Sequence, residues 1–311
     1  MSIFPTKILL ATDGSKDAWL ATNTAIGIAM VTSSELHIVN VEVVAPALLR
    51  PLDVEPTRAE KEARRVLDEE IRNIENVGGT VTESHLRMGA AVQEIVNLAQ
   101  GLEVGLIAVG SRGRSRIKRA LMGSVSDSVV RHAHCPVLVA RRKPLILPAR
   151  ILVATDGSEE ATLAAKTAAE LAYRTYSELH LVSVADTYSS YYVLHEPGLA
   201  ENLQQRAQEV LDDQVKQIEQ SGGEVTGKHV SVSQRHPSDG IVRVAEETEA
   251  DLIVMGSRGL GGIKRALMGS VSDSVVRHAH CPVLVGRKEP PQTLPLSGEA
   301  SSGVRRERSA L

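Results

Sequence analysis

Two short stretches of this chain combine residue types that can hold the phosphate groups of a nucleotide. The first reads Ala-Thr-Asp-Gly-Ser and occurs at residues 11–15 and 154–158. The second reads Gly-x2-Gly-x9-Gly-Ser and occurs at residues 110–124 and 256–270. Glycines let a ligand approach the main chain closely, and a helix start offers unpaired N–H groups with a partial positive charge. The spacing therefore indicates an anion site, present twice.

The residues around the glycines strengthen this interpretation. Ser124 and Ser126 open a predicted helix and can add hydroxyl donors, and basic side chains lie in the intervening loop at Arg112, Lys118 and Arg119. Asp13 stands where a carboxylate can hold a ribose hydroxyl or a metal ion that bridges phosphates. No lysine-bearing Walker loop is present in the sequence.

A simpler interpretation is that the glycines are turn residues and that Ser124 only caps a helix. Two observations favour a ligand site instead. The same spacing occurs in both copies, and each copy of the pattern follows a predicted strand and opens a predicted helix.

The chain consists of two copies of one domain. The segment Lys118–Val139 returns unchanged as Lys264–Val285, and shorter matches extend over both halves. This period is too long for a solenoid unit and indicates a duplicated domain. We expect two domains and two connecting or terminal segments: a first domain over 1–143, a linker over 144–149, a second domain over 150–288, and a disordered Pro/Ser/Gly/Arg-rich tail over 289–311.

Short apolar runs alternate with helical patterns in each half. In the first half, apolar runs predict strands at Lys7–Thr12, Glu35–Val44, Val81–Leu86, Leu106–Val109 and Pro136–Val139. Helical spacing predicts helices at Asp17–Thr32, Glu55–Val77, Val92–Gly101 and Ser124–His134. The second half repeats this order. The alternation predicts an α/β fold with a parallel sheet and helices on both faces, because parallel strands need crossover connections.

Composition narrows the class of protein. The 311 residues are 42% hydrophobic and 23% charged, as in ordinary globular proteins. A net charge of −3 gives no overall field for nucleic acid or an anionic membrane, and no segment approaches the ~18 apolar residues of a spanning helix. Cys135 and Cys281 occupy equivalent positions and are interpreted as small core residues, not a disulfide. We therefore expect a cytoplasmic protein that binds neither nucleic acid nor membranes.

A group of histidines and a cysteine, and a difference between the two nine-residue loops, also bear on function. His132, His134 and Cys135 span the end of a predicted helix and the start of a strand, so their side chains should diverge rather than bind a metal. No base is positioned to activate Cys135 as a nucleophile. Inside the nine-residue loop, Arg114-Ser115-Arg116 of the first half corresponds to Leu260-Gly261-Gly262 of the second. We therefore predict that the first site is the more salt-sensitive one.

These motifs and the tandem arrangement resemble the universal stress proteins of the ATP-binding subgroup, over all of the chain except the linker and the tail. Gly-x2-Gly-x9-Gly-Ser is the motif with which that family binds ATP. The resemblance implies two tandem doubly wound, Rossmann-like domains, each with a five-stranded parallel sheet in the order 3-2-1-4-5. It also implies pairing through the last strand. We expect the halves to pack face to face as a pseudo-dimer through Pro136–Val139 and Pro282–Val285, with a further homodimer and a protein partner left open.

The resemblance also implies which residues contact the nucleotide, which would be ATP, or ADP or AMP. Asp13 and Asp156 would contact the sugar or a Mg or Mn ion bound through the phosphates. Main chain at Val41 and Val184 would contact the adenine. The remaining candidates belong to the two loop motifs or adjoin them, and they would surround the ribose and phosphates. They are Ala11, Thr12, Val109, Gly110, Arg112, Gly113, Gly123, Ser124, Val125 and Ser126 in the first half, and Ala154, Thr155, Met255, Gly256, Arg258, Gly259, Gly269, Ser270, Val271 and Ser272 in the second.

Three functions stay open at the level of sequence. The first is a regulatory binding protein in which nucleotide occupancy alters conformation, oligomerisation or partner choice. The second is a slow ATPase that uses Asp13 or Asp156 with a divalent metal, and the third is an interaction protein without nucleotide. We prefer the first, with no catalytic residue, because no Glu or His is clearly placed as a base near the glycines. A role in stress response follows only from the resemblance.

Overall fold

The computed structural model of the chain describes residues 7–43, 58–113, 122–187, 198–260 and 268–287. Strands and helices alternate through the first half. Its elements are β1 (Lys7–Ala11), α1 (Lys16–Thr32), β2 (Glu35–Glu42), α2 (Arg58–Asn76), β3 (Glu83–Met88), α3 (Ala91–Gly101), β4 (Leu106–Gly110), α4 (Ser124–His132) and β5 (Val137–Ala140).

The second half repeats the series. Its elements are β6 (Arg150–Ala154), α5 (Glu159–Thr175), β7 (Glu178–Asp186), α6 (Leu199–Gln220), β8 (Gly227–Ser233), α7 (Pro237–Glu247), β9 (Leu252–Gly256), α8 (Ser270–His278) and β10 (Val283–Gly286).

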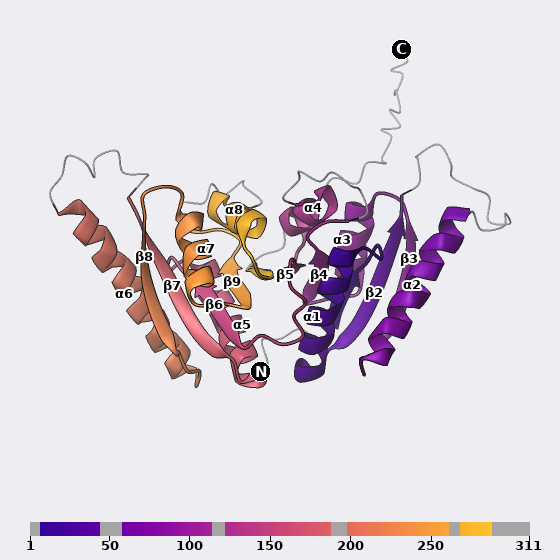
Figure 1. Cartoon of the computed structure of the whole chain (residues 1–311), viewed down its shortest axis with the longest axis horizontal. Coiled ribbons are helices and arrows are strands. Elements are labelled where there is room, and N and C mark those ends of the chain that lie inside the picture. Colours follow the sequence, from indigo (N-terminus) through magenta and orange to yellow (C-terminus); the bar gives the residue numbers. More distant parts are fainter. Residues whose placement is uncertain (1–6, 44–57, 114–121, 188–197, 261–267, 288–311) are drawn as a thin grey trace, which may run out of the picture.

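The strands form one ten-stranded sheet in the order β3-β2-β1-β4-β5-β10-β9-β6-β7-β8. Within the first half the strands are parallel in the order 3-2-1-4-5, which is the order that the resemblance implies. The second half has the corresponding parallel order. Figure 1 shows the two halves side by side, with α4 and α8 near each other at the top of the view. The predicted α/β fold with two tandem domains is confirmed.

Helices cover both faces of the sheet. On one face, α1, α2, α5 and α6 contribute to a single buried apolar cluster with the sheet; on the other, α3, α4, α7 and α8 contribute to a second. Alternate strand residues point to opposite faces, so Ile8 and Leu10 join the first cluster and Leu9 the second. A strand that is buried on both faces reads as a continuous apolar run, which is why these strands could be predicted.

The ends of the predicted elements differ from the structure by one or two residues. β3 spans Glu83–Met88 and not Val81–Leu86, since its parallel pairing with β2 begins only at Glu83. Helix α4 ends at His132 and not at His134 because Ala133 already has extended backbone, with φ −60° and ψ 143°. The chain therefore leaves α4 and enters β5 within a few residues.

Some predictions fall on residues outside the described ranges. These are the start of the predicted helix at residues 55–57, the loops at 114–121 and 261–267, and the tail beyond residue 287. The boundaries of the two domains stay predictions. Among the helices that the structure describes, none combines the length and the apolar character needed to cross a membrane.

The linker packs against both halves. Thr24 on α1 donates from Oγ1 to the carbonyl of Leu145 at 2.7 Å, and Ser177 donates from Oγ to the carbonyl of Pro148 at 2.6 Å. Gly27 of α1 leaves room for the linker, since a Cβ there would lie 1.9 Å from the carbonyl oxygen of Ile146. The linker is thus a packed segment of the fold.

The two halves join through the last strand of each, as expected. They join edge to edge, however, and the expected face-to-face packing is wrong. Antiparallel pairing of β5 with β10, centred on Leu138 and Leu284, makes the sheet continuous. Beside it, Arg131 of α4 pairs with Asp273 of α8, and the counterparts Arg277 and Asp127 pair at 2.5 Å. The same contact is thus made twice with the halves exchanged, as in an isologous dimer.

Two arginines complete this junction. Arg141 donates to the carbonyl of Val276 near the carboxyl end of α8, and its counterpart Arg287 donates to the carbonyls of Val130 and Arg131 at the end of α4. A cation there satisfies carbonyls that have no intrahelical partner and interacts favourably with the helix dipole. Burial lowers the pKa of each guanidinium to about 10, so both stay charged at neutral pH.

Candidate functional site

A cavity opens at the carboxyl ends of the parallel strands in each half, where doubly wound sheets bind ligands. Its volume is about 330 Å³ in the first half and about 470 Å³ in the second. Lys118 and Arg119 lie outside the described residues, whereas all the candidate residues that the structure describes line these cavities. They are Ala11, Thr12, Asp13, Val41, Val109, Gly110, Arg112, Gly113, Gly123, Ser124, Val125 and Ser126 in the first half, and Ala154, Thr155, Asp156, Val184, Met255, Gly256, Arg258, Gly259, Gly269, Ser270, Val271 and Ser272 in the second.

Sequence reasoning missed one further wall of each cavity. Ala91 and Ile95 at the start of α3, and Pro237 and Ile241 at the start of α7, add apolar surface beside the strand ends. Apolar positions in the first turn of a helix that follows a strand at this edge are a signal that could have identified them. They make one side of each cavity suited to an aromatic ring and leave the polar groups on the other.

The turn after β1 holds Asp13 in place. Gly14 takes a left-handed backbone with φ 71°, which glycine adopts readily, and Ser15 N donates to Asp13 Oδ1 at 3.0 Å. Ser15 in turn caps α1, accepting at Oγ from Ala18 N at 3.2 Å. The second half repeats these bonds around Asp156. The carboxylates are therefore positioned by their own turns, before any ligand binds.

The start of α4 differs from the start of α1 because no side chain caps it. Its N-cap is Gly123, with no side-chain hydrogen bond to the first turn, and α8 begins in the same way at Gly269. The first N–H groups of a helix have no intrahelical acceptor. At Ser124 and Val125, which line the cavity and are exposed, these groups lie where an anion can reach them.

Packing explains the glycines at the end of β4 but not those at the start of α4. A Cβ at Gly110 would lie 2.5 Å from the carbonyl carbon of Asp17 on α1, so protein packing alone requires glycine there. At Gly123 a Cβ would find its nearest neighbours at 3.4 Å, and the backbone angles of φ −77° and ψ 153° suit any residue. Gly269 is nearly the same, with 3.3 Å to the nearest atom. The protein's own packing therefore does not require glycine at position 123, whereas at position 269 a Cβ would make a tight contact with the carbonyl oxygen of Ser257.

One predicted phosphate donor has a structural role instead. Ser126 is buried, and its Oγ contacts the carbonyl of Ser111 at 2.9 Å and that of Gly123 at 3.1 Å. Its single hydroxyl proton is thus used to tie the loop after β4 to α4. Ser272 makes the same contacts in the second half. The prediction that these two hydroxyls face phosphate is therefore not supported by this arrangement, whereas Ser124 is exposed.

The arginine of each motif is held by an acid in the first turn of α1 or α5. Arg112 Nε lies 3.2 Å from Asp17 Oδ2, and the Arg112 side chain is 51% exposed. Arg258 is held more closely by Glu160, at 2.7 Å from Nε to Oε1 and 2.8 Å from its backbone N to Oε2. Each arginine lines its cavity with its charge partly neutralised. The first is the freer of the two to turn toward an anion.

Each cavity offers a divalent cation one aspartate, and Glu42 adds a second carboxylate to the lining of the first cavity. Asp156 already accepts from Ser158 N at 3.0 Å and from Leu260 N at 2.8 Å. In the part of the chain that the structure describes, no set of three His, Cys, Asp or Glu ligands forms at either cavity. This donor set fits Mg²⁺ held mainly by phosphate oxygens and water, which is how Mg²⁺ is commonly bound with nucleotides. Such an ion would neutralise phosphate charge.

A buried carboxyl lies behind the first cavity. Glu70 of α2 is 4% exposed and accepts from the Thr22 hydroxyl, and its counterpart in the second half is Gln214. Burial, above all, raises the pKa of Glu70; the hydroxyls of Thr22 and Thr12 lower it, and the nearby charge of Asp13 raises it. Gln214 instead accepts from the Thr155 hydroxyl at 3.2 Å. The many charges along this helix gave no sign from sequence that one carboxyl is buried.

The histidine and cysteine group does not assemble into a site. Burial raises the pKa of the Cys135 thiol to about 12 and that of Cys281 to about 12, so neither is a thiolate at neutral pH. His132 Nδ1 contacts the carbonyl of Ser128 at 2.8 Å. Both cysteines are free and buried, as expected for small core residues.

Comparison with known proteins relates the whole chain to one family. The model of the universal stress protein family matches residues 5–141 and again residues 149–287. The universal stress protein Rv2005c of Mycobacterium tuberculosis (strain ATCC 25618 / H37Rv) is 30% identical over 298 residues, which cover 90% of this chain and 97% of that protein. Universal stress protein Rv2623 of the same strain is 31% identical over 234 residues, covering 72% of this chain and 76% of that protein.

The similarity extends to a solved structure of two-domain length. The crystal structure of a universal stress protein from Archaeoglobus fulgidus DSM 4304 is 28% identical in sequence and gives a TM-score of 0.68. The match covers 91% of this chain and 98% of that chain. Both halves, and not one domain alone, are therefore shared.

Proposed function

This chain belongs to the universal stress protein family, and we propose that it is a regulatory protein that binds one adenine nucleotide, preferably ATP, in each half. The adenine would lie against Val41 or Val184 and the apolar wall of α3 or α7. The phosphates would lie at the uncapped start of α4 or α8, with Asp13 or Asp156 at the sugar or at a Mg or Mn ion. The expectation of a cytoplasmic protein is part of this proposal.

The observation that supports nucleotide binding most directly is the pair of glycines at helix starts. Backbone angles do not require glycine at position 123 or 269, and at position 123 no neighbouring atom requires it either. A side chain there would, however, stand between the cavity and the first N–H groups of α4 or α8. Close approach of a ligand to the main chain explains why both positions lack one.

The regulatory part of the proposal rests on α4 and α8. The first turn of α4 lines a cavity, and later residues of the same short helix, Asp127 and Arg131, contact the other half. A ligand that shifts α4 by even a small amount therefore also shifts the junction. We infer that occupancy alters how the halves sit together, and so which partner or oligomer is favoured.

Hydrolysis of ATP is not part of the proposal. The cavity-lining residues that the structure describes include no histidine. Glu70, the buried carboxyl near Asp13, does not line the cavity. A slow ATPase and a nucleotide-free interaction protein stay as alternatives that the same experiment separates.

The test is ATP binding by isothermal titration calorimetry, together with mass spectrometry of small molecules released from freshly purified, denatured protein. We expect two nucleotides per chain, and a loss of at least ~10-fold in affinity at both sites in Gly123→Val/Gly269→Val protein. Gly101→Val is the matched control, because a Cβ at Gly101 has no neighbour within 4 Å and the position is outside the cavity. Circular dichroism checks that all variants are folded.

Each result has a defined meaning. Unchanged ATP affinity in the double variant contradicts the assignment of the phosphate position. Protein that carries no nucleotide and whose melting temperature does not rise with ATP points to the nucleotide-free interaction protein. Steady phosphate release that persists through purification, and that disappears in Asp13→Ala/Asp156→Ala protein, points to the ATPase.

A further inference from the structure

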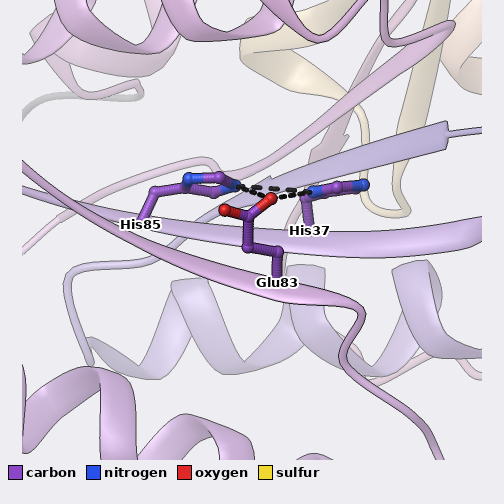
Figure 2. Close-up of side chains that lie close together, drawn as sticks. All are labelled: His37, Glu83 and His85. Atoms are coloured by element: carbon purple, nitrogen blue, oxygen red, sulfur yellow. Dashed lines mark hydrogen bonds and ion pairs between the residues drawn. The ribbon is translucent and has the colours of Figure 1, made fainter.

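Three metal-ligating side chains meet at the opposite end of the first half from the nucleotide cavity. His37 lies near the start of β2, and Glu83 and His85 lie on β3, the edge strand of the sheet. Residues 83 and 85 are two apart on one strand, so their side chains project from the same face, where His37 of the neighbouring strand joins them. Figure 2 shows the two imidazoles with nitrogens facing each other and the Glu83 carboxylate beside them.

The distances among the three facing atoms form a compact triangle. His37 Nδ1 and His85 Nε2 are 3.4 Å apart, and Glu83 Oε2 lies 3.8 Å from the first and 3.7 Å from the second. Metal–nitrogen and metal–oxygen bonds of ~2.0–2.1 Å in a tetrahedral site place ligand atoms ~3.3 Å apart. The two nitrogens already have that spacing. The Glu83 side chain is 59% exposed and free to move the remaining few tenths of an ångström.

The histidines are also prepared for this role by their surroundings. The other ring nitrogen of His37, Nε2, lies 3.4 Å from Glu35 Oε2, which favours the tautomer that leaves Nδ1 able to bind a cation. Carboxylate–histidine pairs of this kind commonly orient metal-binding imidazoles. The side chains of His37 and His85 are only 5% and 9% exposed, so their positions are fixed by packing.

The second half shows what the same pair of histidines does without the carboxylate. His180 and His229 occupy the corresponding positions, but the counterpart of Glu83 is Gly227. Their facing nitrogens are 3.0 Å apart, the usual length of a direct hydrogen bond. A side chain could not be added at position 227 without movement, because a Cβ there would lie 2.4 Å from His180 Nδ1. Glu178, the counterpart of Glu35, lies 3.5 Å from His180 Nε2 and also accepts from Arg150 Nε at 2.6 Å, so the loss of the carboxylate at position 227 is the difference that matters.

We propose that His37, Glu83 and His85 form a binding site for one divalent transition-metal cation, of which Zn²⁺ fits best, and that the second half has no such site. Two imidazoles and one carboxylate are ligands suited to Zn²⁺ and related ions and unlike the all-oxygen sets of Mg²⁺ and Ca²⁺. The exposed side of Glu83 leaves the fourth position to water. The cation would join the edge strand β3 to β2, whose other end lines the nucleotide cavity.

The protonation state is compatible with this role. Burial lowers the pKa of His85, an effect that the nearby charge of Glu83 partly offsets and that His37 and Arg87 add to. A lowered pKa favours the neutral form of the imidazole, which is the form that binds a metal ion; the proposal itself rests on the geometry of the three side chains.

The test uses the tag-free full chain, treated with a chelator, dialysed and titrated with Zn²⁺ by calorimetry without added nucleotide. Titration with Co²⁺ reports the geometry through the visible absorption of a tetrahedral ion. We expect one tight site per chain, a loss of ~100-fold or more in affinity in His85→Gln protein, and a loss of at least ~10-fold in Glu83→Gln protein. His229→Gln is the matched control, and it should leave the affinity and stoichiometry of the tight site unchanged.

The variants also define how the proposal fails. It is overturned if the wild-type chain binds no Zn²⁺ tightly, or if Glu83→Gln protein binds it as well as wild type. Equal weakening by His85→Gln and His229→Gln would likewise overturn it, because binding would then belong to histidine pairs in general. Thermal unfolding with and without Zn²⁺ gives a second readout: the metal should raise the melting temperature of the wild type and of His229→Gln protein, but not of His85→Gln protein.

Discussion

The described parts of the identical segments, residues 122–139 and 268–285, meet at the centre of the molecule, whereas two positions at which the halves differ in chemistry lie toward its edges. The central segments supply α4, β5, α8 and β10, which form the junction by reciprocal contacts. Glu70 of α2 and Glu83 of the edge strand β3 are replaced by Gln214 and Gly227. The comparison indicates that residue types at the junction are restricted by contacts between the halves, whereas residue types at these outer positions can differ.

A physical reason for identity at the centre is that each of its residues serves two contacts. In an isologous interface a residue can contact its partner in its own half and the equivalent partner in the other half. A substitution in one half therefore removes a contact in each half. Asp127 illustrates this, since it pairs with Arg131 in its own helix and with Arg277 in the other half. The same short helix starts at the nucleotide cavity. Peripheral positions such as 83 and 227 have neighbours only within their own half.

The largest effect should come from breaking the junction, and it should be the same from either side. Arg141→Ala and Arg287→Ala each remove a buried guanidinium from the carboxyl end of a helix in the opposite half. Hydrogen bonds to charged groups contribute ~1.5–3 kcal/mol, so we expect each variant to lower the free energy of unfolding by about that amount. Chemical denaturation monitored by circular dichroism measures it.

The symmetric view of the junction predicts equality of these two losses within ~0.5 kcal/mol, the usual scatter of independent sites. Lys143→Ala is a suitable control in the same stretch of chain, because that side chain is exposed. A large loss for Arg141→Ala with none for Arg287→Ala would show that the junction is not energetically symmetric.

The strong local patterns of this chain explain how much could be predicted from sequence. Buried parallel strands such as β1 and β4 read as apolar runs, and their carboxyl ends fall at one edge of the sheet. That is why Asp13 and Gly123, which are far apart in the sequence, could be placed at one cavity from the sequence alone. The duplicated pattern supported the same conclusion independently.

The features that sequence reasoning missed depend on contacts between elements. In the sequence Glu70 is one of many charged residues of α2. Only the packing of α2 shows that it is buried against Thr22. The Glu83-x-His85 pair has meaning only with His37 of another strand. Nothing in the sequence indicated that Arg141 caps a helix of the other half. Ser126, predicted as a phosphate donor, ties the loop after β4 to α4.

A second, smaller effect should distinguish the two nucleotide sites. Arg112 is more exposed and more loosely held than Arg258, and the sequence of the first loop is the more cationic. In Gly269→Val protein only the first site should bind, and in Gly123→Val protein only the second. Between ~0.05 and ~0.3 M NaCl we expect ATP affinity to fall several-fold more in the first of these proteins, because exposed charges are screened by salt.

Calorimetry at several salt concentrations checks this comparison. Arg112→Gln should bring the salt dependence of the first site toward that of the second, while Arg142→Gln, an exposed arginine outside the cavity, should not change it. Parallel salt dependences in the two single-site proteins would remove the distinction between the sites.

The smallest effect concerns the buried pair of positions 70 and 214. Burial raises the pKa of Glu70 in the folded chain, whereas in the unfolded chain the carboxyl has its ordinary value of about 4.5. The folded state therefore retains this proton to higher pH than the unfolded state does. The resulting contribution to stability is complete below the ordinary value and is lost as pH rises through the raised one.

Glu70→Gln should abolish this pH dependence, because an amide accepts from Thr22 without ever ionising. We expect the variant to be more stable than wild type by ~1 kcal/mol near neutral pH, a difference of a few degrees in melting temperature, and to match wild type at about pH 4. Gln214→Glu should do the reverse, lowering stability near neutral pH and less so in acid. Positions 70 and 214 are equivalent in the two halves. If the stability of either variant differs from wild type by the same amount at every pH, the difference between the two positions comes from packing and not from ionisation.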